Sequence, residues 1–218
     1  MLTTSTMIIE RIEPMIRQEH TFKVLLSDGS VLKTQDYVIA DLGLYPGMEL
    51  DEAGLKALRD AAGKASAKVR AVRIISASGV SKQELQRRLT QKGETEQDAQ
   101  EAVQWLSDLE LLDDARTAEQ LVRSAVHKGY GKSRIKQILY EKRIPEEFWE
   151  DALAEVPDMG DAVDKFLQQR LRGREPDQKE LKRTIDALLR RGHSWSDIRA
   201  GLRRYSSSLE ADLEDNYE

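Results

Sequence analysis

The sequence has 218 residues, of which 33% are charged and 39% hydrophobic, and its formal net charge is −5. Aromatic residues make up only 6%, so a core must be built mainly from aliphatic side chains, which suits packed helices better than a continuous all-β core. Cysteine is absent, which excludes disulfides, thiolate nucleophiles and Cys-ligated zinc. The sequence contains no run of about 18 apolar residues and no signal-like start, so it predicts a cytoplasmic protein that does not enter a membrane.

Residues 1–63 carry a pattern typical of short β-strands followed by one helix. Three runs contain the apolar β-formers: Met7–Ile12, Phe22–Leu26 and Val31–Leu32. An Asp28-Gly29 turn separates the last two runs, which predicts a β-hairpin or a three-stranded sheet. We expect Tyr37–Leu44 to cover one face of this sheet. Asp51 should then cap a helix that ends near Gly63.

The rest of the chain repeats itself with a period of about fifty residues. Val72, Leu85, Leu89, Lys92, Ala99 and Val103 return as Val122, Ile135, Leu139, Lys142, Trp149 and Leu153, and again as Leu171, Thr184, Leu188, Arg191, Ile198 and Leu202. Five of these six columns keep their chemical character, and Thr184 is the exception. Because no short helix buries its apolar face alone, the pattern predicts a mainly α fold, with three tandem three-helix repeats in an elongated array after a small β-rich N-terminal domain.

The boundaries follow from capping residues, prolines and apolar stripes. We predict the β-rich extension at 1–63, repeats at 64–112, 113–159 and 160–206, and an acidic tail at 207–218. The nine predicted helices are Lys68–Ser76, Lys82–Gln91 and Glu96–Leu106; Ala115–His127, Ser133–Lys142 and Glu146–Glu155; and Ala162–Leu171, Gln178–Arg190 and Trp195–Arg204. Ser81, Thr95 and Ser194 are the predicted N-caps of three of them.

Charge is distributed in blocks along the chain. Residues 116–143 contain eight Lys or Arg against two Glu, residues 144–164 contain eight acids and no base, and residues 165–204 contain twelve bases against five acids. Such blocks are usual on solvated helix faces with salt bridges between neighbours. A partner-binding surface is the alternative interpretation.

The motifs that suggest chemistry have simpler structural explanations. Gly129-Tyr130-Gly131-Lys132-Ser133 ends like a phosphate-binding loop, but Val126 stands where that loop needs glycine and the surrounding pattern is helical. We therefore predict a tight turn with two glycines at positive φ and Ser133 capping the next helix. Asp113 and Asp114 should cap a helix rather than form an acid–base pair. The histidines are too scattered for a metal site, and we predict neither a catalytic residue nor a cofactor.

Two further groups of residues have structural predictions. His127 and His193 should lie at helix C-termini, where a cation complements the helix dipole. The tryptophans at 105, 149 and 195 are predicted to be core residues rather than stacking platforms.

Basic residues are the best candidates for a functional surface, because many lie away from the apolar stripes. At 100° per residue, Lys179, Arg183 and Arg190 share one helix face, opposite Leu181 and Leu188. A second row follows one flank of the Ile135 stripe. The full predicted partner-binding set is Lys132, Arg134, Lys136, Arg143, Lys179, Arg183, Arg190, Arg199 and Arg203. Such rows could meet phosphates or an acidic protein groove.

The second repeat resembles the RecX family of bacterial recombination regulators. Leu112-Asp113-Asp114-Ala115-Arg116-Thr117-Ala118 is similar to the family's Leu-Asp-Asp stretch, and Lys128-Gly129-Tyr130-Gly131-Lys132-Ser133-Arg134-Ile135 to its Gly-Tyr-Gly turn. Glu84-Leu85 with Leu89 and Lys92-Gly93 matches a third motif. The resemblance extends over roughly residues 68–205.

This resemblance implies a non-enzymatic regulator. It would bind RecA in the groove of its nucleoprotein filament and inhibit ATP hydrolysis, filament growth and strand exchange, in the context of DNA repair, homologous recombination and the SOS response. We expect such a protein to act as a monomer, with DNA contact possible inside the filament. The alternative from another class is a helical-repeat protein that binds DNA directly, with steep salt dependence.

Overall fold

The computed structural model describes residues 6–16 and 18–206, so the predicted acidic tail lies outside the described residues. The chain divides into two compact units, Met1–Leu112 and Asp113–Glu218. The fold is mainly helical with a small antiparallel sheet near the start, which confirms the predicted fold class.

The sheet of the first unit has four strands in the order β3-β2-β1-β4. They are β1 (Met7–Pro14), β2 (Thr21–Leu26), β3 (Val31–Gln35) and β4 (Glu49–Leu50). The predicted turn is confirmed: Gly29 has a φ of +81°, and Asp28 Oδ1 accepts a hydrogen bond from Ser30 N at 2.8 Å. The short strand β4 was not predicted, because two residues carry no periodicity of their own.

Helix α1 (Asp36–Asp41) follows β3 directly. The sheet core contains Ile9, Val24, Leu26, Leu44, Leu50 and Leu58. In the predicted covering segment, Val38 and Leu44 are buried whereas Tyr37 is 48% exposed. The segment Tyr37–Leu44 therefore covers only part of the sheet face, and Leu58 of the next helix completes the core.

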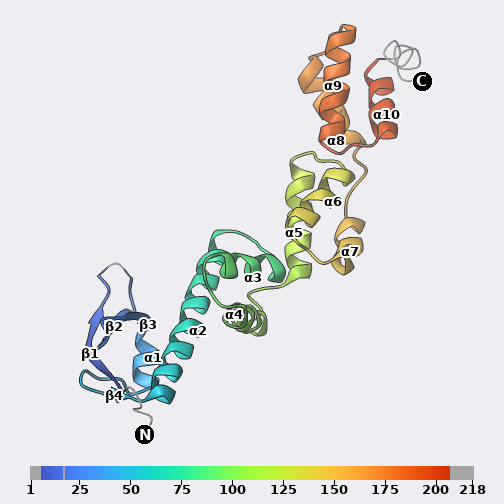
Figure 1. Ribbon diagram of the computed structural model, residues 1–218. Coiled ribbons are helices and arrows are strands. Elements are labelled where there is room, and N and C mark those ends of the chain that lie inside the picture. The colour runs from blue at the N-terminus through green and yellow to red at the C-terminus, as the bar shows by residue number, and fades with distance from the viewer. Residues whose placement is uncertain (1–5, 17, 207–218) are drawn as a thin grey trace. The chain divides into compact units, whose positions relative to one another are not determined.

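Helix α2 (Glu52–Ala77) is a continuous helix of 26 residues that runs beside the sheet (Figure 1). The predicted helix end near Gly63 is therefore wrong, as is a separate helix over Lys68–Ser76. The segment is rich in alanine, the best helix former, and Ala62, Ala65, Ala67 and Ala71 are buried. A Cβ on Gly63 would lie 2.7 Å from Asp98 Oδ2, so this glycine permits close packing rather than ending the helix.

Three helices pack together in the remainder of the first unit. These are the second half of α2, α3 (Lys82–Gln91) and α4 (Glu96–Asp108). Their shared core includes Leu85, Leu89, Val103 and Leu106. The predicted caps are confirmed, since the Ser81 and Thr95 side chains accept hydrogen bonds from the backbone N–H groups of Glu84 and Asp98.

The second unit contains two more three-helix groups. The first has α5 (Asp114–His127), α6 (Lys132–Glu141) and the pair η1 (Glu146–Phe148) and α7 (Trp149–Ala154). The second has α8 (Gly160–Leu171), α9 (Gln178–Arg190) and α10 (Trp195–Tyr205). Each has its own apolar core. Asp113 caps α5 as predicted, and Ser194 forms a capping box at α10.

The backbone confirms the sequence repeat at one turn in each group. Gly93, Arg143 and Gly192 occupy the same repeat column, and their φ angles are +92°, +55° and +83°. In each turn the residue after this position donates its backbone N–H to a buried leucine five residues earlier, at 3.0–3.2 Å. These leucines are Leu89, Leu139 and Leu188, which form one of the predicted apolar columns. Thus all three groups end their middle helix in the same way.

Candidate partner-binding surface

Five of the nine predicted binding residues project from two helices of the second unit as exposed, unpaired cations. Lys132 and Lys136 lie one turn apart on α6, and Lys179, Arg183 and Arg190 lie on α9. All five side chains are exposed. Within the described part of the chain, none of them has an ion-pair or hydrogen-bond partner. Their charge is therefore available to a partner.

The other four predicted residues are engaged within the molecule. Arg134 Nη1 lies 3.1 Å from Glu141 Oε1 on the same helix. Arg143 is exposed, and Arg199 and Arg203 lie on α10, where Arg199 is half-buried; all three have partners of their own. The structure thus separates the predicted set into free cations on α6 and α9 and cations that already take part in internal interactions.

The two rows of free cations meet at a contact between the second and third helix groups, which we call the joint: residues 128–133 and 191–193. The backbone N–H of Gly131 donates to Arg191 O at 2.8 Å, and that of Ser133 donates to Gly192 O at 3.2 Å. Helix α6 begins inside the joint at Lys132, and α9 ends one residue before it at Arg190, so one cation of each row lies at or next to the joint.

Glycine is required on both sides of the joint. A Cβ on Gly131 would overlap the backbone of Gly192, and one on Gly192 would overlap the backbone of Arg134. Gly129 has a positive φ of +69°, as predicted, whereas Gly131 has a φ of −74°. The predictions that Gly131 has a positive φ and that Ser133 caps the next helix are therefore wrong. Gly131 is the N-cap residue, and its lack of a side chain permits close contact between the two turns.

Arg191 stabilises the joint through two cation–π contacts and one hydrogen bond. Its guanidinium lies 5.3 Å from the ring of Tyr130 and 5.2 Å from that of Phe166, both within cation–π range. Its Nη2 also donates to Lys128 O at 2.6 Å. This arginine was identified in the sequence only as a repeat position, because its two aromatic neighbours come from different helix groups.

His193 is buried at the joint, with 4% of its surface exposed. Its Nε2 lies 3.1 Å from Gly129 O, so Nε2 must carry the proton of this hydrogen bond. Burial lowers the pKa of His193, the hydrogen bond to Gly129 and the charge of Asp197 oppose that effect, and Arg191 adds to it. His193 lies just beyond the C-terminus of α9, as predicted, but its burial disfavours the predicted cation there, whereas His127 lies exposed in the last turn of α5.

The tryptophan prediction is confirmed in part. Trp149 packs against the core of its helix group and donates its indole N–H to Ile144 O at 3.0 Å. Trp105 packs against the core of the first unit, with Lys68 Nζ 5.1 Å from its ring. Trp195 is 37% exposed in the first turn of α10, so the prediction of a core role is wrong there.

Two other kinds of site are not found among the described residues. No group of three or more His, Cys, Asp or Glu side chains among them is arranged to hold a metal ion. None of their helices combines the length and the apolar character needed to cross a membrane. The described residues thus form a mainly helical protein with a small antiparallel sheet, and its second unit carries exposed cations on α6 and α9.

Comparison with known proteins identifies the family. Residues 113–153 match the family described as "RecX, second three-helix domain". The chain is 34% identical over 135 residues to the Regulatory protein RecX of Vibrio parahaemolyticus, covering 61% of this chain and 87% of that protein. It is 32% identical over 139 residues to the protein of the same name from Vibrio vulnificus, covering 63% and 91%. The chain belongs to the RecX family of regulatory proteins.

Solved structures have the same fold. A structure titled "Crystal structure of regulatory protein RecX" superposes with a TM-score of 0.61 at 21% identity, covering 94% of this chain and 99% of that one. The RecX structure from Lactobacillus salivarius gives a TM-score of 0.57 at 21% identity, covering 66% and 96%. The fold of RecX proteins therefore extends over most of this chain.

Proposed function

We propose that this regulatory protein binds RecA or its nucleoprotein filament and inhibits ATP hydrolysis, filament growth and strand exchange. Membership of a family whose members are called regulatory protein RecX supports this proposal. The single observation that carries it is the set of unpaired cations on α6 and α9. Exposed cations without internal partners can attract and contact a partner of opposite charge.

The joint holds the helices that carry the two rows of cations in contact with each other. Its backbone hydrogen bonds and the Arg191 contacts fix the start of α6 against the end of α9. Cations held on two fixed helices can contact an extended target at several points without further loss of backbone freedom, and only their side chains become ordered on binding. Many weak contacts along a polymer then add to a useful affinity.

The decisive experiment reverses four of these charges together, as Lys132→Glu, Lys136→Glu, Arg183→Glu and Arg190→Glu. At roughly 0.5 kcal/mol for each exposed charge pair, we expect a loss of about 2 kcal/mol, or roughly thirtyfold in affinity for the RecA filament. Single-strand-dependent ATP turnover by RecA should then need correspondingly more protein for the same inhibition. Helix content measured by circular dichroism should stay unchanged.

A matched control reverses exposed charges on another helix of the same unit. Lys165 and Arg170 of α8 are exposed and have no partner among the described residues, so Lys165→Glu with Arg170→Glu changes the net charge without altering either row. This variant should inhibit RecA almost like the unmodified protein. The four reversals change the net charge by −8 and the control changes it by −4, so a loss in the control about half as large would mean that net charge, not the two rows, controls binding.

The unmodified protein and the variant with four reversals also distinguish RecA binding from direct DNA binding. A DNA binder would bind duplex DNA without RecA, with a logarithmic salt slope of about −0.9 for each phosphate contacted. We expect weak RecA-free binding, since the formal charge of the chain is −5. If the protein bound duplex DNA tightly without RecA and the four reversals abolished that binding, DNA would replace RecA as the proposed partner.

A further inference from the structure

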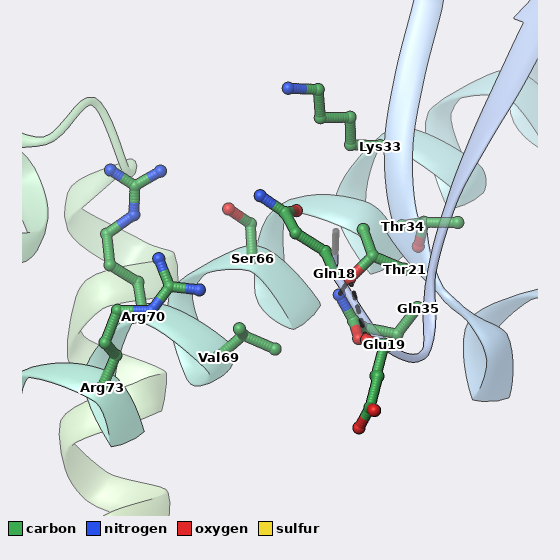
Figure 2. A pocket seen from close by; sticks show the side chains of 10 residues that line it. All are labelled: Gln18, Glu19, Thr21, Lys33, Thr34, Gln35, Ser66, Val69, Arg70 and Arg73. Atoms are coloured by element: carbon green, nitrogen blue, oxygen red, sulfur yellow. Dashed lines mark hydrogen bonds between the residues drawn. The ribbon is translucent and has the colours of Figure 1, made fainter. Parts of the chain in front are cut away.

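A polar cavity of about 430 Å³ lies in the first unit between strand β3 and helix α2. Figure 2 shows Lys33 extending from the strand on one side, and Arg70 and Arg73 extending from the helix on the other. Glu19 is the one acidic residue among those that line the cavity. Its walls therefore favour a ligand that carries negative charge.

The cations of the cavity are held in different ways. Arg70 is fixed: its Nε lies 2.8 Å from Glu94 Oε1, and its Nη1 donates to Lys92 O at 2.9 Å. Lys33 and Arg73 are exposed and have no ion-pair partner within the described ranges. Two of the three cations are therefore free to bind a carboxylate.

Strand β3 presents unused backbone groups. It is an edge strand, and its hydrogen-bonded pairs with β2 fall at even-numbered residues, because Leu26 N donates to Ser30 O and Asp36 N donates to His20 O. Hydrogen-bonded and non-bonded pairs alternate in an antiparallel ladder. The backbone N–H and C=O groups of Lys33 and the N–H of Gln35 therefore point away from β2, whereas the C=O of Gln35 belongs to the N-cap of α1 and accepts the first hydrogen bond of that helix. Both residues line the cavity.

An apolar hollow of about 380 Å³ adjoins this cavity. Val69 lines both, and Tyr37, Val69 and Val72 in the hollow are 48%, 38% and 39% exposed. Trp105 forms another part of its wall, with Lys68 over the ring. A single ligand could thus place a charged part beside Lys33 and Arg73 and an apolar part beside Val69.

We propose that this cleft, formed by β3 and one face of α2, binds an extended acidic peptide segment of a partner protein that carries one or two apolar side chains. The peptide pairs with the free edge of β3, its carboxylates meet Lys33 and Arg73, and its apolar side chain enters the hollow beside Val69. Strand addition of this kind takes its affinity from backbone hydrogen bonds and its specificity from side-chain pockets.

A peptide fits these features better than a nucleic acid. A phosphodiester backbone has no N–H donors, so it cannot continue the β-ladder at the free edge of β3 as a peptide backbone does. The inference does not depend on RecA binding, because no residue of the α6 and α9 rows lines either hollow.

The test uses the full chain and the fluorescein-labelled synthetic peptide Glu-Asp-Asp-Leu-Phe-Asp-Glu, with binding followed by fluorescence anisotropy. Arg73→Glu should weaken binding about tenfold or more. Arg59→Glu is the matched control, since Arg59 is also exposed on α2 and without an ion pair among the described residues, and it should change affinity less than about twofold. Methylation of alternate backbone amides of the peptide should also cost about tenfold or more, because it removes the donors that pair with β3.

Several outcomes would overturn the proposal. Equal effects of Arg73→Glu and Arg59→Glu would mean nonspecific charge attraction, and full binding by the methylated peptide would exclude strand addition. Tight binding of a labelled single-stranded oligonucleotide, lost in Arg73→Glu while the peptide fails to bind, would assign the cleft to nucleic acid. The protein with Lys132→Glu and Lys136→Glu should bind the peptide normally, so failure of this proposal and failure of the RecA proposal are distinguishable.

Discussion

The joint between the second and third helix groups offers a sharp test of the packing, because the repeat supplies a natural control. Gly192 and Gly93 occupy the same column and have φ angles of +83° and +92°. A Cβ on Gly93 would meet nothing within 4 Å. A Cβ on Gly192 would overlap the backbone nitrogen of Arg134 and lie 2.6 Å from its Cβ. Gly192→Ala and Gly93→Ala therefore both place alanine at a positive φ, but only Gly192→Ala also makes the new Cβ overlap Arg134.

The expected magnitudes follow from these contacts. Alanine at positive φ should cost about 1–2 kcal/mol at either position. Gly192→Ala adds an overpacking cost of about 1–3 kcal/mol. It should also weaken the two backbone hydrogen bonds of the joint, at about 0.5–1.5 kcal/mol each. We expect Gly93→Ala to lower the free energy of unfolding by about 1–2 kcal/mol, and Gly192→Ala to lower it by about 2–6 kcal/mol more.

Native-state hydrogen exchange measured by mass spectrometry on the full chain can resolve the two effects, since peptides from each unit are followed separately. Gly192→Ala should reduce protection in α6 and α9, and Gly93→Ala only in the first unit. Equal losses of stability, or unchanged protection at residues 128–133 in Gly192→Ala, would refute the steric account of the joint.

Three further predictions concern single residues. Arg87 and Arg88 lower the pKa of Glu84 from 4.5 to about 2, and its side chain is only 6% exposed, so Glu84→Gln should lower the free energy of unfolding at pH 7 by roughly 3 kcal/mol. Because the folded pKa of His193 is lowered from 6.5, its contribution to stability should be complete above pH 6.5 and decline as the pH falls below it; urea unfolding at pH 7 and pH 5 measures this. Arg143→Gly should raise the unfolding free energy by about 0.5–1 kcal/mol, since it relieves a φ of +55°.

Each of these has a control. The Glu84 contribution should be lost as the pH falls from 4.5 toward 2, so the variant and the unmodified protein should converge there; a constant difference would contradict the ion-pair explanation. His193→Gln should remove part of the change between pH 7 and pH 5, and an unchanged pH profile would assign it to other groups. Destabilisation by Arg143→Gly would mean that the interactions of the arginine side chain outweigh its backbone strain.

The local features of this protein are predictable from the sequence because their signals lie within a few residues. The bounds of α3 and α9 agree with prediction residue for residue. The caps Ser81, Thr95 and Ser194 are confirmed for the same reason, since a cap side chain bonds a backbone group three residues away.

The errors occur where distant parts of the chain meet. Gly63 resembles a helix end locally, but burial of the surrounding alanines and the close approach of Asp98 keep α2 continuous. Gly131 and His193 were interpreted from their own helices, whereas each contacts a turn about sixty residues away. Local patterns do not contain these contacts.

The sequence by itself determined the mainly helical class, the threefold repeat and the set of basic residues from which a binding surface could be drawn. Only the tertiary structure decided which of these cations are free and which are already paired, that two glycine turns form the joint, and that Lys33 and Arg73 face one cavity. The physical reason is that helix formation and capping depend on neighbours in the chain. Burial, ion pairing and cavities depend on which surfaces the folded backbone brings together.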